Sequence, residues 1–271
     1  LLLGNLPDIK RLYKIAKKSK LYVILDSCDT LGAKLKKIKA GKYADIITTS
    51  FYGSHIITAG GGGGLLAMNN PKWRDKAKVL RGWGRGSALI SESEDPKLRY
   101  KSKIGNIPYD SKFIFSEQGY NFLPMEIGSA FGNAQLKKLD KFKKIREKNF
   151  KHLINFFEKY SEYFILPMQE KNIDTQWLSF PLTIKKFAPF SRFEIISFLE
   201  KNNIQTRPIF TGVITKQPGF KNILHKNGVK SFPVSQEIME RGFLIGCHHG
   251  LEEKHLNKIE KIFTSFLGNL K

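Results

Sequence analysis

The chain has 271 residues, which is enough for one large domain or two ordinary ones with a hydrophobic core. Hydrophobic residues make up 41% and charged residues 26%, as in folded globular proteins. The net charge of +22 would suit nucleic acid, but lysines lie along nearly every expected helix, without a zinc-finger, RNA-recognition or helix-turn-helix signature. We therefore interpret the charge as a solvated surface that would also favour an anionic substrate, with nucleic-acid binding as the rival hypothesis.

No apolar run approaches the roughly 20 residues of a membrane helix, and the leading leucines are too few for a signal peptide. We expect a cytoplasmic protein with no membrane partner. The two cysteines, Cys28 and Cys247, lack the spacing of a disulfide framework or a zinc site. The neighbouring His248 and His249 would point to opposite faces of a strand, so no metal site is predicted.

Residues 8–18 show the apolar spacing of a helix, and residues 21–25 form an apolar run that predicts a buried strand ending at Asp26. A helix, an apolar strand and then a polar residue are typical of α/β folds, whose ligands bind at the carboxyl ends of the strands. Asp26 is therefore a candidate ligand-binding residue, with a loop cap as the alternative interpretation.

A strand–turn–strand unit follows. Residues 44–49 form a β-branched run that ends at Ser50, and residues 65–68 form a second short strand after five consecutive glycines. His55 lies on the tight connection between the two strands. Taken alone, a turn histidine that bonds only to backbone is the commoner case. Histidine titrates near neutral pH, however, and so suits proton abstraction.

Residues 50–63 resemble the motif S-F-x-x-x-K-x-x-T-x-G-E-G-G of the DegT/DnrJ/EryC1/StrS family of sugar aminotransferases, which use pyridoxal 5′-phosphate (PLP). His55 stands where the family has the lysine that binds PLP covalently, and Gly61 replaces the motif glutamate. The lysine-to-histidine replacement is typical of one branch, the nucleotide-sugar 3-dehydratases, in which histidine acts as a base on a non-covalently held cofactor. An imidazole cannot form a stable imine, which is consistent with that role. The matching positions are Ser50, Phe51, Thr58, Gly60, Gly62 and Gly63.

The segment D-S-C-D-T-L-G that begins at Asp26 resembles the family's E-D-x-C-D-x-L-G. The resemblance implies that Asp26 pairs with the protonated pyridine nitrogen of PLP, which keeps the ring an electron sink. It implies that Asp29 lines the cofactor, and it assigns Ser50 to cofactor binding and Tyr52 to substrate binding.

Cys28 matches the first of four iron–sulfur ligands in some members of this branch. The other three would follow the segment R-G-W-G-R at residues 81–85, and no cysteine occurs there. One thiolate cannot hold a cluster that needs four ligands, so no iron–sulfur cluster is expected.

The pattern of residues 71–80 predicts a helix, and that of residues 91–103 predicts a polar loop. The following G-Y-N at residues 119–121 resembles a family motif whose asparagine reaches the PLP phosphate of the neighbouring subunit. Asn121 is therefore assigned to cofactor binding, and a homodimer is expected. A turn asparagine with a purely structural role is the alternative interpretation.

After Pro124 the apolar spacing predicts a long bridging helix, and from about residue 160 short strands and helices alternate as in α+β domains. Strands are expected at residues 178–184, 204–207 and 243–247, and helices at residues 192–202 and 252–267. Arg207 falls where the family has a substrate-contacting arginine, and a guanidinium suits a diphosphate or sugar hydroxyls.

The resemblance implies an α/β fold, the later part of a fold-type-I PLP-dependent transferase whose N-terminal part is missing. Residues 1–140 would belong to the PLP-binding large domain, and residues 141–271 would form the bridging helix and a small C-terminal α+β domain. The implied reaction is C3 dehydration of a nucleotide-linked 4-keto-6-deoxyhexose, in deoxysugar and lipopolysaccharide O-antigen biosynthesis. It would use PLP or pyridoxamine 5′-phosphate (PMP), His55 as base and glutamate as amino donor. A nucleotide-sugar aminotransferase and a catalytically inert fragment are the alternatives.

Overall fold

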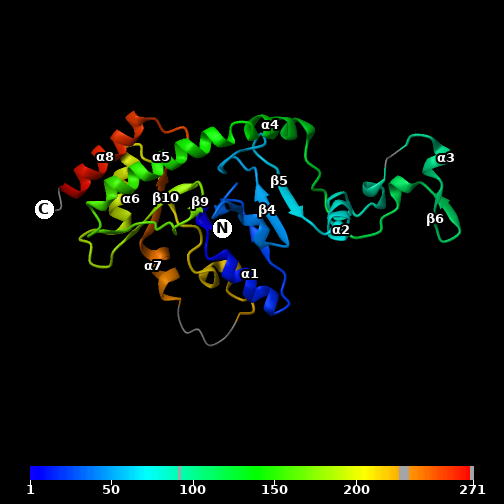
Figure 1. Ribbon diagram of the computed structural model, residues 1–271, viewed down its shortest axis with the longest axis horizontal. Coiled ribbons are helices and arrows are strands. Elements are labelled where there is room, and N and C mark those ends of the chain that lie inside the picture. The colour runs from blue at the N-terminus through cyan, green and yellow to red at the C-terminus, as the bar shows by residue number, and fades with distance from the viewer. Residues whose placement is uncertain (91–92, 226–231, 269–271) are drawn as a thin grey trace. The chain divides into compact units, whose positions relative to one another are not determined.

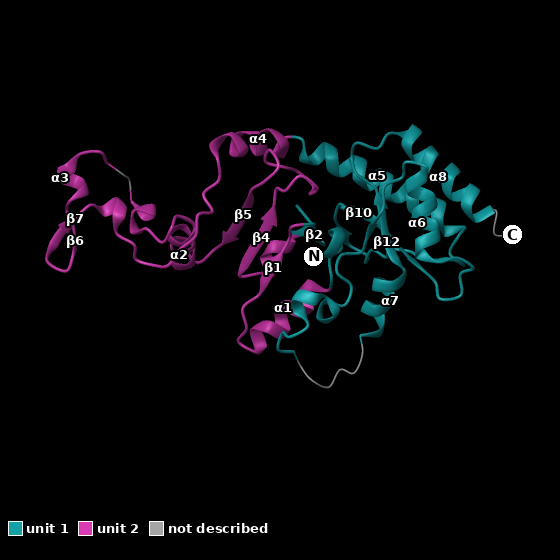
Figure 2. Ribbon diagram, turned by 180° about the vertical axis from the view of Figure 1, so that it is seen from behind, with its two compact units in different colours: residues 1–7, 29–38, 138–271 teal, residues 8–28, 39–137 magenta. Residues whose placement is uncertain are grey.

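The computed structural model describes residues 1–90, 93–225 and 232–268. The chain forms two compact units, and neither is one continuous stretch (Figure 2). Unit 1 contains residues 1–7, 29–38 and 138–271, and unit 2 contains residues 8–28 and 39–137. The boundary between residues 137 and 138 lies close to the division at residue 140 expected from the sequence, and that domain division stays a prediction.

Unit 2 is built on a three-stranded sheet in the order β1-β4-β5 (Figure 2). Strand β1 (Ile24–Asp26) runs parallel to β4 (Ile46–Ser50), and β5 (Gly64–Met68) runs antiparallel to β4. The expectation of a buried strand over residues 21–25 is wrong in its extent. Leu21 and Tyr22 precede β1 and are exposed, and only the middle residue of β1 is buried.

The helices of unit 2 begin where their caps predict. Asp8 accepts a hydrogen bond from the Arg11 backbone N–H at 3.1 Å and starts α1 (Ile9–Lys18). Asn70 does the same for the first turn of α2 (Pro71–Arg81), whose leading proline has no N–H to satisfy. A further helix, α4 (Glu126–Leu136), closes the unit.

The polar loop predicted over residues 91–103 contains the short helix α3 (Pro96–Arg99), and a hairpin begins at its end. The hairpin pairs β6 (Ser102–Ile104) with β7 (Ile107–Tyr109). Residues 91 and 92 of the expected loop lie outside the described residues. The signal for the hairpin is a two-residue Gly-Asn turn at residues 105 and 106 between short apolar segments.

Unit 1 is an α+β layer with a four-stranded antiparallel sheet in the order β11-β12-β10-β8. The long bridging helix expected after Pro124 is two helices, because α4 of unit 2 ends at Leu136 and α5 of unit 1 starts at Leu139. Helix α8 packs against both α5 and α6, and α7 packs against β10 and β12 (Figure 1). The strands are β2 (Lys34–Leu35), β3 (Ile38–Lys39), β8 (Phe164–Ile165), β9 (Ile173–Asp174), β10 (Ser179–Ile184), β11 (Arg207–Pro208) and β12 (Gly242–Gly246), and the helices are α5 (Leu139–Glu158), α6 (Arg192–Lys201), α7 (Pro233–Arg241) and α8 (Glu253–Gly268).

Aromatic side chains form the core of unit 1. Phe157 on α5 meets Phe263 on α8 edge-on at 4.8 Å and stacks on Phe180 of β10 at 5.4 Å. These three rings are fully buried, and each buried ring of this size removes roughly 150–250 Å² from water. None of the helices in the described part of the chain combines the length and apolar character that crossing a membrane requires.

Candidate active site

The carboxyl ends of two parallel strands bring the first site residues to one edge of the sheet. In the β1–β4 pair Asp26 lies opposite Thr48, so Asp26 ends β1 while β4 continues to Ser50. Ligands of open α/β sheets bind at this edge, where loops replace strands. The structure thus places Asp26 and Ser50 at the carboxyl ends of neighbouring parallel strands, and their roles in binding a ligand stay predictions.

The Asp26 carboxylate is held by the residue two positions further along. Its Oδ1 accepts a hydrogen bond from the Cys28 backbone N–H at 3.0 Å. Hydrogen bonding from the Cys28 side chain is the largest influence on the pKa of Asp26, and with the backbone bond and the charge of His55 it lowers that pKa below the usual value. Asp26 is therefore ionised at neutral pH, which suits a partner for a protonated ring nitrogen.

Backbone and hydroxyl hydrogen bonds shape the loop that carries His55. The Ser50 Oγ accepts from the Tyr52 N–H at 3.1 Å, and the His55 N–H donates to the Tyr52 carbonyl at 3.0 Å. The Tyr52 ring stands edge-on to the imidazole with 6.4 Å between ring centroids. Ile56 and Ile57 are buried directly after the half-buried His55, so they anchor the turn.

The glycines after His55 allow the backbone to turn and enter β5. Gly61 has a φ of +103°, a conformation that residues with a Cβ rarely adopt. The family motif has glutamate at this position. In this loop the backbone shape therefore favours glycine, and a side chain there would be strained.

Asp29 belongs to unit 1 and makes a buried structural contact. Its Oδ2 accepts a hydrogen bond from the Leu3 backbone N–H at 3.0 Å, and only 7% of the residue is exposed. This bond fixes the segment of residues 1–7. The cofactor-lining role of Asp29 stays a prediction beside this contact.

Asn121 lies outside the three-stranded sheet of unit 2, in a segment that pairs with residues 82 and 83. Asn121 forms an isolated antiparallel bridge with Gly82, and the adjacent Trp83 N–H donates to the Tyr120 carbonyl at 2.8 Å. Asn121 itself is exposed. Backbone pairing therefore fixes its position while its amide group stays accessible to a ligand.

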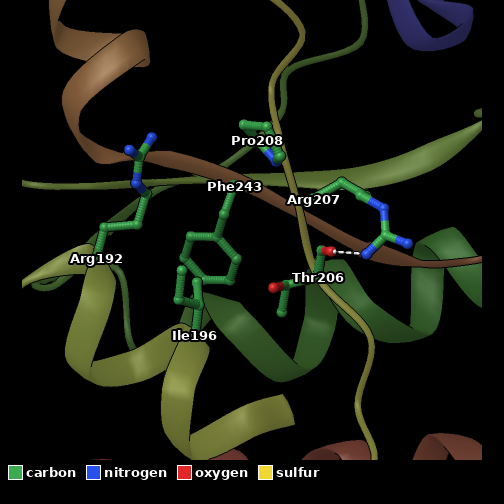
Figure 3. Close-up of a pocket in the computed structure, with 6 residues that line it drawn as sticks. All are labelled: Arg192, Ile196, Thr206, Arg207, Pro208 and Phe243. Atoms are coloured by element: carbon green, nitrogen blue, oxygen red, sulfur yellow. Dashed lines mark hydrogen bonds between the residues drawn. The ribbon is translucent and has the colours of Figure 1, made fainter.

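Arg207 lies in unit 1 at the edge of its antiparallel sheet, beside a pocket of about 310 Å³ (Figure 3). The expected strand over residues 204–207 is shorter than predicted, since β11 contains only Arg207 and Pro208. Arg207 donates to the carbonyl of its neighbour Thr206 at 2.7 Å. Across the pocket, Arg192 donates to the carbonyls of Met239 at 2.6 Å and Gly242 at 3.2 Å, so its role is structural.

The histidines near the chain's end occupy a loop after β12. Burial lowers the pKa of His248, and it lowers the pKa of His249 to about 4. Burial also raises the pKa of the preceding Cys247 thiol to about 12. Within the described ranges no three histidine, cysteine, aspartate or glutamate side chains lie close enough to share a metal ion.

Some residues at these sites were not predicted from the sequence. The part that Cys28 plays in holding Asp26 is one, although an Asp-x-Cys spacing permits an Asx turn. Another is Arg85, whose guanidinium lies over the rings of Trp83, Phe113 and Phe115, close in sequence to the segments that carry Asn121 and Gly82. The alternation of arginine with aromatic residues is the sequence signal that could have identified it.

The parallel β1–β4 pair and its antiparallel neighbour β5, with polar residues at the strand ends, make unit 2 an α/β unit. Together with the family match, this identifies the chain as an α/β protein of the fold-type-I, PLP-dependent class. The model of the DegT/DnrJ/EryC1/StrS aminotransferase family matches residues 2–264, and the chain belongs to this family.

Two curated relatives illustrate the similarity. The lipopolysaccharide biosynthesis protein RfbH of Salmonella typhimurium is 32% identical over 269 residues, which is 98% of this chain and 61% of that protein. GDP-4-keto-6-deoxy-D-mannose 3-dehydratase of Yersinia pseudotuberculosis is 28% identical over 249 residues, 91% of this chain and 61% of that protein. The chain thus spans about three fifths of the length of these relatives.

A solved structure of E. coli GDP-4-keto-6-deoxy-D-mannose-3-dehydratase with bound hydrated PLP superimposes with a TM-score of 0.82 at 23% identity. The match covers 96% of this chain and 65% of that one. This likeness confirms the α/β fold expected from the sequence.

Proposed function

We propose that the protein removes the C3 hydroxyl of a nucleotide-linked 4-keto-6-deoxyhexose with PLP or PMP as cofactor. The observation that carries the proposal is His55 on the β4–β5 loop. It occupies the position of the family's covalent lysine, and the Asp26 carboxylate stands at the same edge of the sheet. An imidazole can move a proton but cannot hold the cofactor by an imine, so it favours dehydration over the lysine-based reaction.

The donor set of unit 2 fits PLP or PMP. Asp26 is ionised, and a carboxylate of this kind would hold a protonated pyridine nitrogen. The Ser50 hydroxyl at the end of β4 and the exposed amide of Asn121 would serve the cofactor's phosphate or hydroxyl groups. When bound, the pyridinium ring supplies an electron sink.

The other roles belong to the chain's own side chains. His55 would accept a proton at its imidazole and return it, and Tyr52, whose ring lies edge-on to His55, would face the substrate. Arg207 would bind the diphosphate or a sugar hydroxyl from unit 1. Glutamate as amino donor, a homodimer and a cytoplasmic location complete the proposal. The family also contains aminotransferases, so transamination of the same substrate class is the alternative function.

Product analysis separates the two functions. The protein is incubated with PLP, glutamate and a nucleotide-linked 4-keto-6-deoxyhexose, and the products are identified by mass spectrometry. Dehydration followed by release yields a sugar one oxygen atom lighter, whereas transamination replaces the ketone oxygen with an amine. We expect the lighter sugar and its loss in His55→Ala. An amino sugar as the main product would contradict the proposal, and no product with any of these sugars would indicate an inert chain.

A further inference from the structure

Two segments of unit 2, residues 82–86 and 115–121, are held together as one platform. Arg85 forms an antiparallel bridge with Phe115, as Gly82 does with Asn121. Between these bridges the Gly84 carbonyl accepts hydrogen bonds from the backbone N–H groups of Ser116 at 2.9 Å and Glu117 at 3.2 Å. We refer to these paired segments as the Arg85 platform.

The Arg85 platform requires unusual backbone shapes. A Cβ on Gly84, whose φ is +84°, would lie 1.9 Å from the Glu117 carbonyl oxygen. A Cβ on Gly119 would lie 2.1 Å from the Gly84 nitrogen. Trp83 has a φ of +60°, which a bulky residue adopts only when its surroundings enforce it. Strain of this kind is concentrated at functional sites and gives the platform a fixed geometry.

This geometry places the Arg85 guanidinium among aromatic rings. Its central carbon lies 4.8 Å from the centroid of the Trp83 ring, 5.4 Å from that of Phe113 and 5.4 Å from that of Phe115. Contacts of a cation with ring faces stabilise and orient it without neutralising its charge. The rings also restrict the rotamers of the long side chain, so less entropy is lost when a ligand binds.

No carboxylate offsets this charge in the part of the chain that the structure describes. Arg85 forms no ion pair or side-chain hydrogen bond there, and its Nε is buried without a hydrogen-bond partner. Two other partly buried arginines each have a carboxylate partner. Arg99 pairs with Asp110, and Arg241 pairs with Glu237 at 2.6 Å. A half-buried guanidinium that is oriented but unpaired is poised for an anion.

We propose that Arg85 binds a phosphate group through its guanidinium, on the same platform that carries Asn121. The ligand chemistry is a phosphate oxyanion, from either the cofactor's phosphate or the diphosphate of a nucleotide-linked sugar. Arg is suited to this task because its planar fork donates two parallel hydrogen bonds to such an anion. The inference rests on the proposed function for the identity of the two phosphate sources, and on the Arg85 platform for everything else.

The first test uses the unaltered protein. Phenylglyoxal modifies accessible arginines, and peptide mapping by mass spectrometry reports the rate at Arg85 and, as an internal control, at the exposed Arg81. PMP is compared with pyridoxamine, and GDP with guanosine, so that each pair differs only in phosphate. PMP has no aldehyde and leaves surface lysines unmodified. We expect at least one phosphate ligand to slow modification of Arg85 several-fold, with no effect of its dephosphorylated partner and none at Arg81.

The second test measures affinity. Arg85→Gln should weaken binding of the protecting ligand by roughly tenfold or more, as expected for losing a charge-assisted hydrogen bond. Arg85→Lys should retain part of the affinity because it keeps the charge and loses the fork. Arg81→Gln makes the same change in charge four residues away, and its affinity should equal that of the wild type.

Protection by PMP would assign Arg85 to the cofactor phosphate, and protection by GDP would assign it to the nucleotide diphosphate. The inference is overturned if PMP and GDP bind but neither protects Arg85, or if pyridoxamine and guanosine protect it equally well. Failure of PMP to bind at all would instead contradict the proposed function. Because the protection experiment needs no variant, it decides the matter even if Arg85→Gln does not fold.

Discussion

Under the proposed function, a single imidazole on the β4–β5 loop would determine which chemistry the site at the edge of the unit 2 sheet supports. A lysine at position 55 would condense with the cofactor's aldehyde and hold the cofactor covalently. With histidine there, the cofactor would be bound only by non-covalent contacts, so residues such as Asp26, Ser50 and Asn121 would have to supply its affinity. Their substitution should therefore affect cofactor binding more strongly here than in a lysine-containing relative.

The substitution His55→Lys tests this directly. We expect the variant to bind PLP covalently, because the lysine amine would occupy the loop position of the family's PLP-binding lysine. Borohydride reduction followed by peptide mapping should identify a pyridoxyl group on Lys at position 55 in the variant. The wild type should show no pyridoxyl group on residues 50–64.

His255→Lys, on α8 of unit 1, is the control for non-specific labelling of a new lysine. A pyridoxyl adduct on a native lysine of the wild type, at one per chain, would contradict the non-covalent mode of binding. Equal labelling of the two new lysines would show that position 55 is not a cofactor site.

Site residues were predictable where the motif is local and not where the partner is distant in sequence. His55, Ser50 and Tyr52 lie within six residues, and local backbone bonds determine their loop. Asp26 was placed correctly at a strand end because one apolar run precedes it. The Leu3 contact of Asp29 spans 26 residues, and no local pattern indicates it.

At the level of the element, the close approach of Gly84 and Gly119 holds the Arg85 platform together. Gly119→Ala would force a Cβ to within 2.1 Å of backbone, so the two segments must separate. We expect a loss of about 1–3 kcal/mol in the free energy of unfolding, as for other overpacked sites. Urea denaturation provides the measurement, and hydrogen exchange at residues 82–86 should rise in the same variant.

Gly82→Ala is the matched control on the same platform. Its Cβ would have no neighbour nearer than the Lys78 carbonyl oxygen at 3.6 Å, which is an ordinary contact. The loss in the free energy of unfolding should be clearly smaller than for Gly119→Ala. Equal costs at the two positions would show that the close backbone approach is not what stabilises this element.

The loop after β12 should make stability depend on pH. His249 stacks on Phe142 at 3.6 Å, and burial together with the Arg146 charge lowers its pKa to about 4. The unfolded chain has the usual histidine pKa near 6.5, so it binds more protons than the folded state between pH 6.5 and 4. Stability should therefore fall as the pH is lowered through this window.

The urea midpoint at pH 7 and pH 5 measures the effect. His249→Gln removes the titrating group, so we expect a smaller decrease between the two pH values than in the wild type. His248, whose pKa is also lowered, should account for part of the remainder. His225→Gln changes an exposed histidine and should leave the decrease unchanged. If the urea midpoint of His249→Gln falls as much as that of the wild type between pH 7 and pH 5, His249 is not the group responsible.

Elements were predictable from the sequence where capping residues and turn residues mark their ends. The helices predicted over residues 8–18 and 71–80 are present, and Asp8 and Asn70 cap their first turns. The break between α4 and α5 has neither proline nor glycine, and its two residues retain helical backbone angles, so the apolar spacing continues through it. Strand β1 is shorter than predicted because hydropathy does not reveal whether a neighbouring strand pairs with an apolar segment.

For the whole molecule, the chain passes repeatedly between two units, and sequence patterning does not predict such a division. Residues 29–38 belong with the C-terminal unit although they follow β1 directly. Contacts between distant segments accompany this assignment, such as the hydrogen bond that the Gln176 side-chain amide donates to the Leu31 carbonyl at 2.9 Å. Asp29 and Arg207 belong to unit 1, and Asp26, Ser50, Tyr52, His55 and Asn121 belong to unit 2.

The last prediction concerns assembly. If the protein is a homodimer in which Asn121 serves the neighbouring subunit's cofactor, Asn121→Ala should raise the cofactor dissociation constant by roughly tenfold. This corresponds to about 1–2 kcal/mol for one hydrogen bond to a charged group. The chemistry at His55 should be unaffected once cofactor is saturating. Equilibrium titration with PMP gives the constant, and size-exclusion chromatography with light scattering gives the oligomeric state.

Mixing Asn121→Ala with His55→Ala decides whether the asparagine acts between subunits. A mixed dimer would hold one site with both lesions and one site with neither, because each subunit would lend its Asn121 to the other. At a cofactor concentration below the raised dissociation constant, each variant alone should have low activity. One of the two sites in every mixed dimer should regain full activity, so a 1:1 mixture with statistical exchange should recover about a quarter of the wild-type activity per site. If Asn121 acts within its own subunit, every site of a mixed dimer keeps one lesion. Subunit exchange followed with differently tagged chains, but without recovered activity, would therefore overturn the assignment.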